Sequence, residues 1–129
     1  LELGRLKDIL GVKGNYALDV AVGVAAAPAA EALKPDATVE RIIATALSYL
    51  SMTPRKEVEQ GLEWARNVSS WKELRPLYQE KYDGHPNSNA VEVLSGGLAC
   101  FLVAEGDPKQ AILYAVNFGR DTDCKAYIC

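Results

Sequence analysis

The sequence is poor in the residues that mark several functional classes. It has one histidine, three cysteines and one methionine among 129 residues, and the cysteines form no Cys-x-x-Cys pair. A structural zinc site needs about four cysteine or histidine ligands at short spacing, so none is expected. An odd number of cysteines without a repeating pattern does not describe a disulfide scaffold either. We therefore expect a cytoplasmic protein with reduced thiols.

Charge and hydropathy exclude two further kinds of partner. Fourteen Lys and Arg stand against seventeen Asp and Glu, a formal net charge of −3, so we expect no nucleic acid as partner. The longest small and apolar stretch, residues 20–30, is mostly alanine and contains Pro28. It is too short to cross a bilayer, and charged residues among the first thirteen argue against a signal peptide. We expect no membrane partner.

The length and residue usage predict one helical domain over residues 1–129. A chain of this length is typical of a single domain, and its 49% hydrophobic and 24% charged residues are typical of globular proteins. Alanine is abundant, and no long stretch alternates apolar with polar residues. We expect an all-α fold, a compact multi-helix bundle of about six or seven helices.

Start and stop signals give the approximate bounds of these helices. Thr53 before Pro54 and Asp107 before Pro108 are typical of helix starts, Ser70 with Glu73 resembles a capping box, and Gly119 is a stop signal. Pro28 and Pro76 are expected to kink or divide their helices. The expected helices span about 1–10, 16–33, 38–52, 53–68, 70–82, 88–106 and 107–118.

One short segment, Gly119-Arg120-Asp121-Thr122-Asp123-Cys124, carries candidate chemistry. Two carboxylates flank a hydroxyl just after a helix stop, and such hard oxygen ligands suit Mg²⁺, Mn²⁺ or Ca²⁺. Arg120 is suited to an anionic group such as a phosphate. The competing interpretation is a solvated turn in which one Asp caps the next helix.

The same segment, extended back to Asn117, resembles the C-terminal metal motif of the ADP-ribosylglycohydrolase family. The residues before it, Glu105-Gly106-Asp107 and Ala111 to Val116, are similar to the family's Gly-Asp and the alanine-rich helix that follows. Upstream, Tyr16 to Ala32, Val39 to Leu50 and Trp71 to Tyr82 also resemble the family. The resemblance covers nearly the whole chain and is most specific over residues 105–124.

The resemblance implies an all-α fold with a binuclear Mg²⁺ centre. It implies hydrolysis of the glycosidic bond between ADP-ribose and a protein side chain, or of a related ADP-ribosyl compound. By motif position, Asp121 and Asp123 would be metal ligands, and Cys124 stands where the family has a third, hydroxyl ligand. Cysteine is a soft and poor ligand for Mg²⁺. Arg120 and Asn117 would border the ADP-ribose, and no residue matches a catalytic acid or base.

The sequence also departs from the family pattern. The family has an early Gly-Asp segment and a Ser/Thr-Asp-Asp-Thr segment that supply further metal ligands, whereas this sequence contains no Asp-Asp pair. The chain therefore resembles the C-terminal part of the family domain, truncated at both ends. Two hypotheses follow. One is an active hydrolase. The other is an inactive fragment that acts as a helical oligomerisation or ADP-ribose-binding module, either a homo-oligomer such as a dimer or the partner of a missing complementary chain.

Other reactive residues have plainer interpretations. His85 lies in an expected loop, where it is either solvated or lines a pocket. Cys100 on an apolar helix is expected in the core, and Trp64 and Trp71 are expected to anchor the core or an interface. No Ser-His-Asp or Cys-His arrangement supports nucleophilic catalysis.

Overall fold

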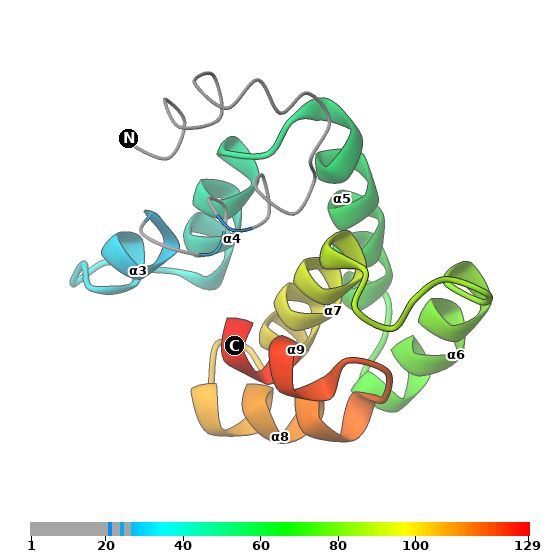
Figure 1. Cartoon of the computed structure of the whole chain (residues 1–129). Helices are drawn as coiled ribbons and strands as arrows, with labels where there is room; N and C mark the ends of the chain where they lie inside the picture. Colours follow the sequence, from blue (N-terminus) through cyan, green and yellow to red (C-terminus); the bar gives the residue numbers. More distant parts are fainter. Residues whose placement is uncertain (1–20, 22–23, 25–26) are drawn as a thin grey trace.

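The computed structural model describes residues 21, 24 and 27–129, and these residues form helices without any β-strand. The all-α prediction is confirmed (Figure 1). The expected helix 1–10 and most of the one over 16–33 lie outside the described residues. The helices are α3 (Ala27–Ala32), α4 (Val39–Ser48), α5 (Met52–Arg66), α6 (Trp71–Lys81), α7 (Ala90–Val103), α8 (Pro108–Phe118) and α9 (Thr122–Ile128).

Helix α7 is the central element of the fold. Its residues 91–100 are all buried, and it contacts α4, α5, α6, α8 and α9 (Figure 1). A helix that is apolar on every side is stable only when neighbours cover it all round. Two polar side chains, Glu92 and Ser95, are buried with it.

The core has two parts. One joins α4 and α5 to the first half of α7, and the other joins α5 and α6 to the second half of α7 and to α8. The first contains Ile43, Ala46, Leu47, Leu50, Val58, Leu62, Val91, Leu94 and Leu98. The second contains Ala65, Leu74, Tyr78, Tyr82, Ala99, Cys100, Ala115 and Phe118. Cys100 is a core residue, as predicted.

Several helix ends lie where the sequence predicts them. Ser70 and Asp107 cap α6 and α8 by accepting hydrogen bonds from backbone N–H groups, and Gly119 ends α8 with a positive φ of 93°. Asn89 caps α7 in the same way. The carboxylate of Glu73, however, accepts from the N–H of Ser69, one residue before the position that a capping box requires.

Two expectations about proline are wrong, those for Pro54 and for a break at Pro76. Helix α5 begins at Met52 after Ser51, so Pro54 is its third residue rather than its first. The N–H groups of a first turn have no partner within the helix, so proline is tolerated there. Pro28 lies in the described part of α3, and the expected kink or break in the helix over 16–33 depends on residues outside the described ones. Pro76 lies within α6 and does not divide it, because Leu74 and Tyr78 fix the helix to the core on both sides.

Helix α9 is absent from the expected helices, and only the capped-turn interpretation of the Asp-x-Asp segment implied a helix there. It has seven residues, too few to show a hydrophobic period, and it packs against α7 and α8. The Gly96-Gly97 pair of α7 makes room for it. A Cβ atom at Gly96 would lie 2.7 Å from Lys125 Cε, and one at Gly97 would lie 2.8 Å from Ile128 Cβ.

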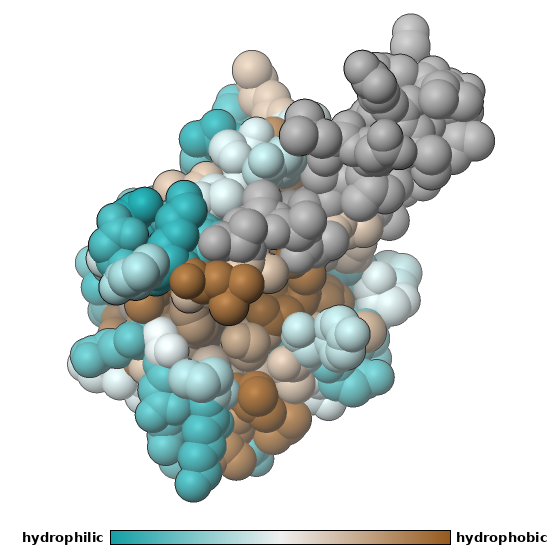
Figure 2. Space-filling view, turned by 90° about the vertical axis from the view of Figure 1, so that its left-hand side faces the viewer, coloured by the Kyte–Doolittle hydropathy of each residue, from teal (hydrophilic) through white to brown (hydrophobic). Residues whose placement is uncertain are grey.

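An apolar hollow opens between the α3–α4 pair and the C-terminal helices. Figure 2 shows apolar side chains gathered on this face of the molecule. The lining includes Ile42, Leu98, Phe101, Pro108 and Ile128. Among the described residues, no helix is both long and apolar enough to cross a membrane.

Candidate metal centre

The turn from α8 into α9 places the candidate ligands. Gly119 and Arg120 both have positive φ values, 93° and 58°, and these reverse the chain after α8. Such backbone is easy for glycine and costs a non-glycine residue of order 1 kcal/mol, so other contacts must hold Arg120. The next helix then begins at Thr122, with Asp121 as its N-cap.

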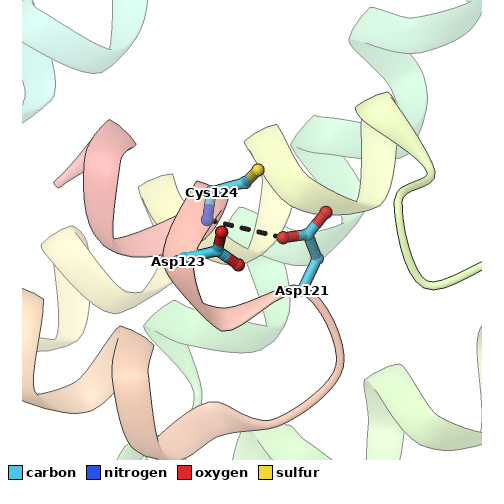
Figure 3. Close-up of side chains that lie close together, drawn as sticks. All are labelled: Asp121, Asp123 and Cys124. Atoms are coloured by element: carbon cyan, nitrogen blue, oxygen red, sulfur yellow. Dashed lines mark hydrogen bonds between the residues drawn. The ribbon is translucent and has the colours of Figure 1, made fainter.

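Asp121, Asp123 and Cys124 gather at the first turn of α9 (Figure 3). One ligand atom from each of the three lies within 4.8 Å of the others. Asp123 and Cys124 are exposed, and Asp121 is half-buried. The structure therefore brings together all three residues that the motif singled out.

Asp121 also caps α9, as the competing interpretation expected. Its Oδ1 atom accepts a hydrogen bond from the backbone N–H of Cys124 at 3.4 Å. Capping and metal binding do not exclude each other, because a carboxylate has two oxygens with several lone pairs. The N-cap bond holds the side chain at the helix start, next to Asp123.

Cys124 lies at the third ligand position of the motif. A hydrogen bond to the Asp121 carboxylate raises the pKa of the Cys124 thiol above its usual value. Sulfur is also a soft donor and a poor ligand for a hard cation. The donor set that fits Mg²⁺ or Mn²⁺ consists of Asp121 and Asp123. A six-coordinate ion would take its remaining ligands from water or from other oxygen groups.

A buried ionic cluster lies behind this turn. Glu92 of α7 is 0% exposed, and its Oε1 accepts from Arg120 Nε at 2.6 Å and from Lys125 Nζ at 3.4 Å. Lys125 is also 0% exposed, donates to the Gly119 carbonyl at 3.2 Å and lies over the Phe118 ring. Burial lowers the pKa of Lys125, and the Glu92 carboxylate opposes that shift.

Sequence reasoning missed Glu92 and Lys125. The available signal was an acidic residue near the start of an otherwise apolar helix, since a buried carboxylate needs a cationic partner. The partner could not be identified from the sequence, because Lys125 lies 33 residues away in a helix that is absent from the expected helices.

The other candidate residues lie at the margin of the site. Asn117 is exposed on α8, and its side-chain amide donates to the Leu113 carbonyl. Arg120 uses Nε for Glu92 and Nη2 for the carbonyls of His85 and Pro86. The ring of His85 is exposed, contacts Tyr82 edge-on and borders a small hollow, so both interpretations of this loop histidine are partly right.

Comparison with known proteins gives one match. The sequence profile of a family described as ADP-ribosylglycohydrolase matches residues 13–129. No curated protein and no solved structure matches significantly.

Proposed function

This chain belongs to the ADP-ribosylglycohydrolase family, whose profile covers residues 13–129, and we propose that it serves Mg²⁺-dependent hydrolysis of ADP-ribosyl linkages. The bond cleaved would join ADP-ribose to a protein side chain, or would belong to a related ADP-ribosyl compound. The family consists of metal-dependent hydrolases that act on ADP-ribosylated substrates.

One observation carries the proposal. The ligand atoms of Asp121 and Asp123 converge within 4.8 Å at the position where the family motif binds metal. Two carboxylates at that separation repel each other, and a divalent ion bound between them would relieve this repulsion. They form the metal-binding pair, and Cys124 stands beside them as a soft and weaker third donor.

A bound divalent cation supplies the positive charge that orients the ribose hydroxyls and the attacking water. The chain's own residues hold and border that position. Arg120 directly precedes the metal-binding pair in the chain and Asn117 is exposed near the end of α8, and we expect both to border the ADP-ribose. The side-chain amide nitrogen of Asn117 donates a hydrogen bond to the Leu113 carbonyl, and its side-chain oxygen can accept one from a ligand. The guanidinium of Arg120 is held in place by its hydrogen bond to Glu92. No described residue is assigned the general acid or base.

Calorimetric titration of ADP-ribose into the protein tests this function. We expect ADP-ribose binding that requires Mg²⁺ and that EDTA abolishes, since the metal-binding pair contributes to binding through the ion that its charge holds. The double substitution Asp121→Asn/Asp123→Asn removes that charge and keeps the size of both side chains. We expect it to lose the Mg²⁺-dependent heat. Asparagine at position 121 still caps α9, so the helix should remain.

The control is Cys124→Ser, which replaces the thiol with a hard oxygen at the same position. We expect Mg²⁺-dependent binding to be kept or strengthened in this variant. Binding of ADP-ribose that is equal in Mg²⁺ and EDTA, and equal in the double variant, would show that the metal-binding pair has no part in recognition.

A second candidate is a helical oligomerisation or ADP-ribose-binding module without catalysis. It is favoured by the apolar side chains of Ile112, Leu113 and Val116, each 43–45% exposed along α8. Such a stripe is typical of a surface that a second copy or a complementary chain covers. The two candidates give different results in one assay. Binding of ADP-ribose without release of ADP-ribose from an ADP-ribosylated protein would favour the module.

A further inference from the structure

Arg120 and Lys125 lie immediately outside the metal-binding pair, one before Asp121 and the other two residues after Asp123. Both contact the same buried oxygen, Oε1 of Glu92. The carboxylate thus connects α7 to the two ends of the ligand segment. Among the described residues, no other acidic side chain forms ion pairs with both Arg120 and Lys125.

Further bonds of the same two side chains close the turn. Lys125 Nζ donates to the carbonyl of Gly119, six residues earlier, and Arg120 Nη2 donates to carbonyls of the α6–α7 loop. By contrast, the recorded hydrogen bonds of Asp121 stay within its own helix turn. The position of the two carboxylates therefore depends on how Arg120 and Lys125 are held.

Charge supports the same conclusion. Glu92, Asp121 and Asp123 with Arg120 and Lys125 make three carboxylates and two cations, a net charge of −1. Without the carboxylate of Glu92 the group would be neutral, and the two cationic side chains beside the site would repel an incoming metal ion. Glu92 thus favours a divalent ion by both position and charge.

We propose that Glu92 is a positioning residue that presets Asp121 and Asp123 for a divalent cation by anchoring Arg120 and Lys125 on either side of them. This inference rests on the proposed function, since it assumes that the pair binds metal. Glu92 Oε2 is buried and finds no hydrogen-bond partner within the described part of the chain.

The test is a Mn²⁺ titration of the whole chain followed by electron paramagnetic resonance, which separates free from bound ion. We expect Glu92→Gln to bind Mn²⁺ about tenfold or more weakly than the unaltered protein, as is usual when the support of a ligand is removed. The spectrum of the ion that remains bound should broaden because the ligands are less uniform. Glu92→Asp keeps the charge and should recover part of the affinity.

Glu31→Gln is the matched control. Glu31 is also a buried glutamate held by one lysine and one arginine, Lys34 and Arg41, but it lies on α3, away from α9. We expect its substitution to leave Mn²⁺ affinity unchanged. A general loss of stability would affect both variants, whereas loss of positioning affects Glu92→Gln alone.

A second variant covers the case in which Glu92→Gln fails to fold. Glu92→Gln/Lys125→Met removes a buried anion and a buried cation together, so the net charge of the group is unchanged, and Arg120 keeps the carbonyls of His85 and Pro86 as acceptors. Weakened Mn²⁺ binding in this variant would support positioning as distinct from charge. If either folded variant binds Mn²⁺ as the unaltered protein does, the inference is wrong while the proposed function stands. If the unaltered protein itself binds no Mn²⁺, the metal role in the proposed function is wrong and the inference with it.

Discussion

At the scale of single residues, the fold depends on glycines that let large side chains approach a helix backbone. Gly61 of α5 faces the hydrogen-bonded pair Tyr78 Oη and Ser95 Oγ, which are 2.6 Å apart. A Cβ atom at Gly61 would lie 2.1 Å from each of these oxygens. The pair is buried, and burial raises the pKa of the Tyr78 hydroxyl well above its usual range. The hydroxyl therefore remains a hydrogen-bonding group at all ordinary pH values.

We expect Gly61→Ala to destabilise the protein by about 1–3 kcal/mol, as overpacking of a core does. Helix propensity alone would give the opposite sign, a gain of about 1 kcal/mol. Urea unfolding followed by circular dichroism measures the difference. In a Tyr78→Phe/Ser95→Ala background, both oxygens are gone and the substitution should cost much less. An equal cost in both backgrounds would contradict the steric explanation.

Of the candidate site, the sequence predicted individual residues of one segment but not the contacts that hold them. Asp121 and Asp123 stand two residues apart after a helix stop, so a local pattern makes them candidates, and the family resemblance favours a metal site over a solvated turn. Glu92 and Lys125 contribute through a contact across 33 residues. No local pattern contains that information, because it depends on the packing of α9 against α7.

At the scale of secondary-structure elements, short polar residues set the ends of the helices. Asp107 accepts from the N–H groups of Lys109 and Gln110 at 2.9 and 3.1 Å, and Pro108 follows it at the first helical position. These signals are local, which explains why the starts of α6 and α8 were predicted correctly. The start of α5 was misplaced, because Ser51 precedes a first turn that contains Thr53 and Pro54, and the sequence alone favoured the later pair.

Removal of the α8 cap should have a moderate and specific cost. We expect Asp107→Ala to lower the free energy of unfolding by about 1 kcal/mol, since two N–H groups lose their acceptor. Asp107→Asn keeps an acceptor oxygen at the same place and should lose only a few tenths of that amount. Thermal unfolding of the two variants gives the comparison. Equal losses in both would mean that the negative charge at the helix start, and not the hydrogen bond, stabilises α8.

At the scale of the whole molecule, the core buries groups that ionise only in strong alkali. Burial raises the pKa of the Cys100 thiol to about 12, and burial also raises the pKa of Tyr82. Both groups are neutral in the folded protein at neutral pH. The unfolded chain, in contrast, ionises its thiols near pH 9 and its tyrosines near pH 10.

The free energy of unfolding should therefore fall as the pH rises above about 9. In this range the unfolded chain releases protons that the folded chain retains, so unfolding is favoured by up to about 1.4 kcal/mol per pH unit for each such group. For the Cys100 thiol the window extends from its ordinary pKa of 9.0 to the raised pKa of about 12. Urea unfolding at a series of alkaline pH values measures the slope. Cys100→Ala should make the slope shallower, and an unchanged slope would show that the thiol is not responsible.

The buried Glu92 carboxylate has a consequence for the order in which the protein can fold. During synthesis α7 leaves the ribosome before Arg120 and Lys125, which follow Glu92 by 28 and 33 residues, so the carboxylate first emerges without its cationic partners. Burying an unpaired charge is strongly unfavourable. We therefore expect the first turn of α7 to dock with its carboxylate ionised only together with residues 120–125, so that the burial of Glu92 and the closure of α9 belong to one step of folding.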